Sequence, residues 1–148
     1  MNSLRLHYKA EDEQHGELLA TVESGEFRGQ GAAWFPVERL REFWRMAGAY
    51  PITEGDEPNL TGGFWDDRGE TVTQCHLGVS LSPHDLLGSI RVRITLGTPA
   101  PRGEDADLHQ TVTVRFCTSY VDIDRFRVAF AAMLEGQAGE ATLEGTHI

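Results

Sequence analysis

The segment from Ala33 to Pro51 constrains the fold most strongly, because it contains one amphipathic helix with a clear beginning and end. Pro36 suits the first turn of a helix, and Pro51 disfavours helical backbone in the residue before it. Between them, apolar side chains recur at helical spacing, at Val37, Leu40, Phe43, Trp44 and Ala47. A helix with one apolar stripe must pack that stripe against another layer, so we expect the rest of the chain to form a sheet with an apolar face.

Alternation of apolar and polar residues marks the strands of that sheet. We predict strands at residues 4–9, 17–23, 27–35, 60–65, 77–81, 90–96, 112–117 and 141–144. A second helix is predicted over residues 123–134, with Asp122 as its N-cap and Gly136 at its end. Gly29 and Gly31 suggest a bulge or a close backbone approach in the third strand. The sequence therefore predicts an α+β fold of about eight short, mostly antiparallel strands, with two helices on one face.

The two halves of the chain, residues 1–70 and 71–148, repeat one order of elements: three strands, a helix and a short strand. An offset of 83 residues places Phe126 on Phe43 and Leu143 on Leu60. Periodic patterning alone can imitate a duplication, so both explanations of this match stay open. A chain of 148 residues has the size of one domain. We predict a single domain over residues 1–148 with an internal pseudo-twofold repeat.

The charge of the chain limits its partners. Asp and Glu number 23 against 13 Lys and Arg, which gives a formal net charge of −10. This balance argues against nucleic acid and anionic membranes as partners and permits a basic protein. The N-terminus lacks the apolar core of a signal peptide, and no apolar run approaches the roughly 20 residues of a membrane span. Cys75 and Cys117 form no redox or zinc motif. We expect a cytoplasmic protein.

The sequence lacks the common motifs of catalysis and metal binding. The six histidines show no spacing typical of a metal site, and Cys75-His76 points its two side chains to opposite faces of a strand. The sequence holds no Gly-x-Ser-x-Gly, and Lys9, its single lysine, lies outside any phosphate-binding loop. We therefore expect neither a metal nor a cofactor, and we favour a binding protein over an enzyme.

Two groups of residues are candidates for a binding site. The first is aromatic and surrounds the first predicted helix, at Trp34, Trp44 and Trp65. Such rings often fill a core, but tryptophan is also enriched at the centres of protein interfaces. The second is acidic and lies in predicted loops, at Glu54, Asp56, Glu57, Asp66 and Asp67, with further acids at residues 11–13 and 104–107. If several of these loops share one edge, they form a negative surface that attracts a basic protein.

A resemblance supports the same interpretation. Gly31 shortly before Trp34-Phe35, Leu40-x-x-Phe43 in a helix, then Tyr50-Pro51 and Leu60-Thr61-Gly62-Gly63 resemble patterns in small bacterial proteins, including immunity proteins encoded beside polymorphic toxins. This resemblance implies a protein that binds and blocks one toxin, often a basic nuclease, and implies no catalytic residues.

Two other functions are compatible with the sequence. The first is a small-ligand-binding protein or enzyme, with a pocket between the first helix and the sheet where Trp34, Trp65 or His76 meet. The second is pairing of two copies of the chain through an exposed strand edge, which would make a homo-oligomer.

Overall fold

The computed structural model of the chain describes residues 1–101 and 105–146. It confirms the α+β class, with antiparallel strands and two α-helices. The elements in chain order are β1 (Asn2–Ala10), β2 (His15–Ser24), β3 (Phe27–Pro36), α1 (Val37–Ala47), β4 (Asn59–Trp65), β5 (Val72–Pro83), β6 (Ile90–Gly97), the 3₁₀ turn η1 (Ala106–Leu108), β7 (Thr111–Thr118), α2 (Tyr120–Leu134) and β8 (Ala141–Glu144).

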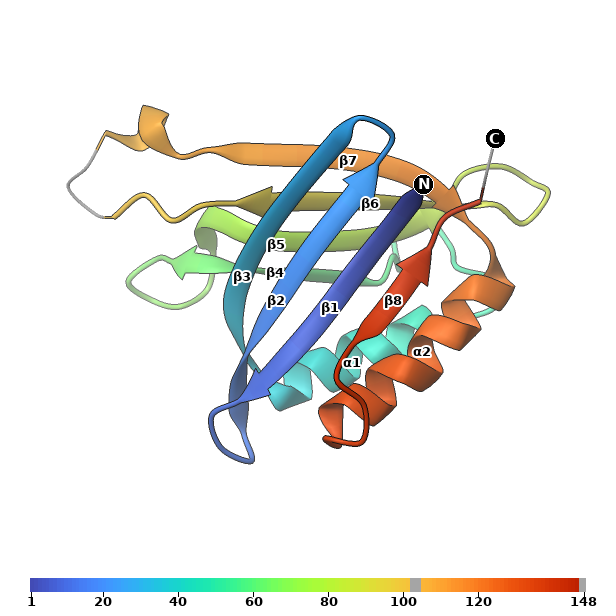
Figure 1. Cartoon of the computed structure of the whole chain (residues 1–148), viewed down its shortest axis with the longest axis horizontal. Coiled ribbons are helices and arrows are strands. Elements are labelled where there is room, and N and C mark those ends of the chain that lie inside the picture. Colours follow the sequence, from blue (N-terminus) through green and yellow to red (C-terminus); the bar gives the residue numbers. More distant parts are fainter. Residues whose placement is uncertain (102–104, 147–148) are drawn as a thin grey trace.

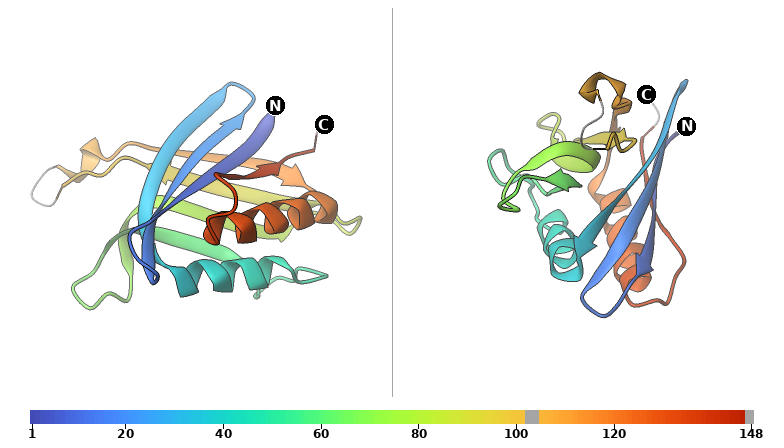
Figure 2. Two further views of the ribbon diagram at one scale, coloured as in Figure 1. Left: turned by 60° about the horizontal axis from the view of Figure 1, so that its bottom comes forward. Right: turned by 90° about the vertical axis from the view of Figure 1, so that its left-hand side faces the viewer.

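The eight strands form two four-stranded sheets. Their orders are β3-β2-β1-β8, called sheet A below, and β4-β5-β6-β7, called sheet B. Sheet A crosses sheet B at an angle, and α1 and α2 lie side by side along one side of the molecule (Figures 1 and 2). The core between these layers contains the buried rings of Phe35, Phe43, Phe126 and Phe130. The two helices thus close one shared apolar core, as their apolar stripes require.

Each half of the chain gives its last strand to the other half's sheet. β4 of the first half pairs with β5, and β8 of the second half pairs with β1. Leu60 lies opposite Val79, and Leu143 lies opposite Leu4. Both leucines are buried, and the predicted offset of 83 residues relates them. The predicted repeat is therefore present in the topology, and the two halves interlock.

Both predicted helices are present, with small differences at their N-termini. Pro36 has extended backbone and precedes α1 as its N-cap. Helix α2 begins at Tyr120, so the prediction of Asp122 as its N-cap was wrong. Ser119 is the cap instead: its hydroxyl accepts the Asp122 N–H at 3.1 Å and donates to the Asp122 carboxylate at 2.9 Å. A Ser-x-x-Asp sequence forms this reciprocal pair like a capping box. Gly136, with φ of +74°, follows the helix as predicted.

Strand β5 is longer than predicted at both ends, because Val72, Gln74 and Cys75 pair with β4 and residues 82–83 pair with β6. Gly62 pairs with Leu77 and Gly63 pairs with Cys75, which leaves His76 as the extra residue of a bulge. The bulge lets two consecutive residues, His76 and Leu77, both point their side chains into the protein, where both are buried.

Of the two roles predicted for Gly31, the close backbone approach is correct, since a Cβ there would lie 2.5 Å from the His76 carbonyl oxygen.

Candidate functional site

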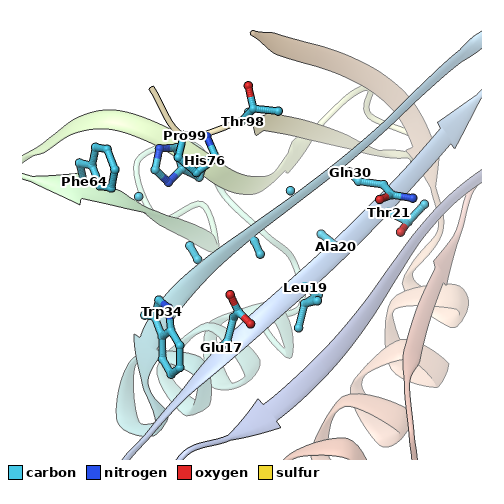
Figure 3. Close-up of a pocket in the computed structure, with 15 residues that line it drawn as sticks. Glu17, Leu19, Ala20, Thr21, Gln30, Trp34, Phe64, His76, Thr98 and Pro99 are labelled. Carbon is cyan, nitrogen blue, oxygen red and sulfur yellow. The ribbon is translucent and has the colours of Figure 1, made fainter. Parts of the chain in front are cut away.

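An open groove lies where β3 of sheet A crosses sheet B. Its volume is about 650 Å³. Residues 31–33 of β3, a glycine and two alanines, line the groove and leave space because their side chains are small. The side chains that give it chemical character come from both sheets and from the segment after β6: Glu17, Trp34, Phe64, His76, Thr98 and Pro99 (Figure 3). Helix α1 contributes none of the lining residues, so this groove differs in place from the pocket expected between the first helix and the sheet.

Glu17 and Trp34 form the sheet A side of the groove. They are directly opposite each other in the β2–β3 pairing, so both side chains leave the same face of the sheet (Figure 3). Trp34 is 56% exposed and Glu17 is half-buried. Among the described residues, no group forms an ion pair or hydrogen bond with the Glu17 carboxylate. The groove therefore contains the Glu17 carboxylate, without a cationic partner among the described residues, beside the solvent-exposed ring of Trp34.

His76 forms the opposite wall and is only 4% exposed. The Gln74 amide accepts the Ala100 N–H at 2.9 Å and donates to the Ala100 carbonyl at 3.0 Å, which fixes its orientation. Its oxygen lies 2.6 Å from His76 Nε2, so Nε2 carries the proton and donates. Burial, and then the nearby His109, lower the pKa of His76 below its ordinary 6.5. His76 is thus a neutral wall residue, tied through Gln74 to the segment after β6.

Three acidic turns continue from the strands and segments that line the groove. One leads into β2, one follows Phe64 and Trp65 of β4, and one follows Pro99 (Figures 1 and 2). Their described acidic residues are Glu11, Asp12, Glu13, Asp66, Asp67, Glu70, Asp105 and Asp107. Glu104, also expected in this group, lies outside the described residues. The end of the molecule that holds the groove is therefore strongly acidic.

The predicted acidic residues do not all share this edge. Glu54, Asp56 and Glu57 precede β4, whereas Asp66 and Asp67 follow it, so the length of β4 separates the two groups (Figure 2). Glu57 accepts the N–H of Gly55 within its own loop at 3.0 Å.

Asp66 has a structural role in its turn. Its carboxylate accepts backbone N–H groups, at 2.9 Å from Glu70 and 3.1 Å from Arg68. The bond from Glu70 contributes most to lowering the pKa of Asp66. Asp66 therefore both shapes the turn and stays charged.

The three tryptophans lie in different environments. Trp44 is half-buried between the helices: its Nε1 donates to the Arg127 carbonyl, and Arg127 Nε donates to the Trp44 carbonyl, each at 2.9 Å. The Arg127 guanidinium lies 4.1 Å from the Trp44 ring centroid. Trp65 is 39% exposed and lies beside Phe64 in a separate hollow of about 360 Å³. Only Trp34 lines the groove itself.

Glu17 was missed in the sequence, although a signal for it exists. The short turn at Gly25-Glu26 sets the pairing of the hairpin, with Ser24 opposite Phe27. Counting back along both strands from this pair puts Glu17 opposite Trp34. The register could have identified the pair, but only the crossing of the two sheets shows that it lines a groove.

The described residues contain no group of three His, Cys, Asp or Glu side chains that could hold a metal ion, and none of their helices could span a membrane. Comparisons with protein-family models, with curated proteins and with solved structures gave no match.

Proposed function

We propose that this protein is a non-enzymatic binding module that holds a basic partner protein across the groove between β3 and sheet B. The observation that carries the proposal is the half-buried, unpaired carboxylate of Glu17 beside the exposed ring of Trp34. A carboxylate partly removed from water is stabilised by a cation. An indole face also attracts a guanidinium or an ammonium group. Together they favour an arginine or lysine side chain as the group that enters.

The surroundings of the groove favour a protein over a small cation. The groove is open, and the acidic turns around it raise the negative potential at this end of the molecule. Such a field accelerates association with a basic surface. The resemblance to immunity proteins suggests a basic toxin as the partner, which this surface would cover. The cytoplasm is the compartment that we propose for this interaction.

An octa-arginine peptide is a suitable probe for the groove. We expect it to shift the indole N–H signal of Trp34 in a ¹H–¹⁵N spectrum, while the signal of Trp44, hydrogen-bonded between the helices, stays in place. Affinity should fall as salt rises, because the attraction is between exposed charges. Glu17→Gln should weaken binding by about fivefold, the equivalent of roughly 1 kcal/mol.

Glu23→Gln is the matched control, because Glu23 lies on the same face of β2 outside the groove and pairs with Arg28. Equal losses in the two variants would show that only net charge matters and would contradict the proposed site. Free argininamide is the second control. If it binds as tightly as the peptide, the groove is a small-ligand site and the proposal of a protein partner is wrong.

A further inference from the structure

The outer face of sheet B carries the opposite charge to the rest of the molecule. None of its four strands contains an Asp or Glu, although the whole chain has 23 of them. Three exposed arginines leave this face, Arg91 and Arg93 from β6 and Arg115 from β7. Their neighbours on the adjacent strands are short and polar, with Ser82 opposite Arg91 and Ser80 opposite Arg93.

The positive charges of these arginines lie close together and lack carboxylate partners among the described residues, which is unfavourable when no ligand is bound. Arg93 and Arg115 are directly opposite each other, and like charges in this position repel. No described carboxylate lies within ion-pair distance of either guanidinium, and Arg91 bonds only to the neutral acceptor Nδ1 of His84, at 3.0 Å. By contrast, Arg5 and Arg28 of sheet A pair with Glu140 and Glu23. An anion between Arg93 and Arg115 would relieve their repulsion.

We propose that the outer face of sheet B binds an extended, carboxylate-rich protein segment, which lies along β7 and pairs its acidic side chains with Arg93 and Arg115. β7 is the last strand in the order of sheet B, so one of its edges is not paired with another strand of that sheet. Among the described residues, the free edge of β7 is hydrogen-bonded to another segment at the C-terminal end of the strand, where Thr146 N–H donates to the Cys117 carbonyl at 2.8 Å. An added strand can use the remaining backbone groups.

The geometry suits alternating acidic residues. Strands lie about 4.8 Å apart, and every second side chain of an added strand points to the outer face. A carboxylate on the outer face of the added strand would lie next to Arg115 on β7. Arg93 on β6 is one strand further away, a distance that its long side chain can span. No aromatic residue lies directly opposite these arginines: their cross-strand neighbours are Ser80, Ser82 and Cys117, and Arg93 and Arg115 face each other. This favours a peptide over single-stranded nucleic acid, whose bases stack on aromatic rings.

The test compares three probes on the full-length protein: an acetylated (Thr-Glu)₄ peptide, the neutral (Thr-Gln)₄ peptide and the oligonucleotide (dT)₈. We expect only the glutamate peptide to bind measurably, to shift the amide signals of Thr113 and Arg115 and to protect β7 amides from hydrogen exchange. Arg93→Gln with Arg115→Gln should weaken it by roughly threefold to tenfold. The control is Arg5→Gln with Arg28→Gln, which removes the same charge from sheet A.

Each other outcome contradicts the proposal. Equal binding of the glutamate and glutamine peptides would exclude recognition of carboxylates, and tighter binding of (dT)₈ would identify a nucleic-acid surface. Equal losses in the two double variants would mean a general charge effect. Self-association in light scattering that Arg93→Gln with Arg115→Gln abolishes would identify a second copy as the occupant. Glu17→Gln should leave binding of the glutamate peptide unchanged, so this inference and the proposed function can fail separately.

Discussion

His76 shows how one inserted residue changes the chemistry of a strand. The bulge in β5 turns its imidazole into the protein, where it packs edge-on against Phe64 with ring centroids 4.6 Å apart. Its Nε2–H is held by Gln74, and burial keeps the ring neutral. The groove wall thus contains a histidine that binds a proton less tightly in the folded protein than in the unfolded chain.

We therefore predict that His76 makes the protein less stable in mild acid. The pKa of His76 is lowered in the folded protein, so below about 6.5 the unfolded chain binds more protons. The free energy of unfolding should then decrease as the pH falls from 7.5 to 5.5. Urea unfolding at both pH values measures this decrease, which should be smaller in His76→Gln. An NMR titration that places the pKa of His76 above 6.5 would contradict the prediction.

At the scale of elements, a reciprocal pair of hydrogen bonds joins α1 to α2, in addition to the packing of Phe43 against Phe130, whose ring centroids lie 5.9 Å apart. Trp44 and Arg127 are 83 residues apart, the same offset that relates Leu60 to Leu143. The two residues occupy corresponding positions of the two helices, and each donates to the other's carbonyl oxygen. Trp44 therefore stabilises the helix pair. It also lines a hollow of about 350 Å³ between the two helices, and its role as a binding residue stays a prediction.

Trp44→Phe should lower the free energy of unfolding by about 1–3 kcal/mol, because the carbonyl of Arg127 loses its donor in a half-buried site. Arg127→Met should have a similar effect, and a double-mutant cycle should show coupling of roughly 0.5–3 kcal/mol. Arg125→Met is the control, since exposed Arg125 pairs only with Asp122 at 3.5 Å and should change stability by less than about 1 kcal/mol. Additive effects of Trp44→Phe and Arg127→Met would refute the coupling.

The elements could be predicted because their signals are local. Alternation in residues 90–96 and helical spacing after Pro36 are set by neighbours in the chain. The assignment of strands to sheets could not be predicted, because exchange of β4 and β8 depends on contacts between distant segments. The candidate site has the same limit: Trp34 was identified from its residue type, whereas Glu17 and His76 become its neighbours only through a register and a bulge.

At the scale of the whole molecule, the exchange of strands determines how the chain can be divided. Without β8, sheet A loses the strand that covers β1, and without β4, sheet B loses the strand that covers β5. Each half would then expose Leu60 or Leu143 on a strand without its partner sheet. Residues 1–70 and 71–148 should therefore not form stable monomers when expressed separately, and circular dichroism of each fragment should lack a cooperative thermal transition.

A circular permutant that starts at Glu70 and ends at Gly69 should instead fold like the parent. The N-terminus lies close to the last described residues, since Gly145 N–H donates to the Asn2 carbonyl at 2.8 Å, so a short Gly/Ser linker after the C-terminal residues can close the chain. The new ends lie in the exposed β4–β5 turn. Because the two halves have the same order of elements, the permutant merely exchanges their positions in the chain and keeps both sheet orders. We expect native-like amide spectra and a cooperative urea transition. A molten permutant, or a half-chain that unfolds cooperatively as a monomer, would show that the halves do not depend on each other in this way.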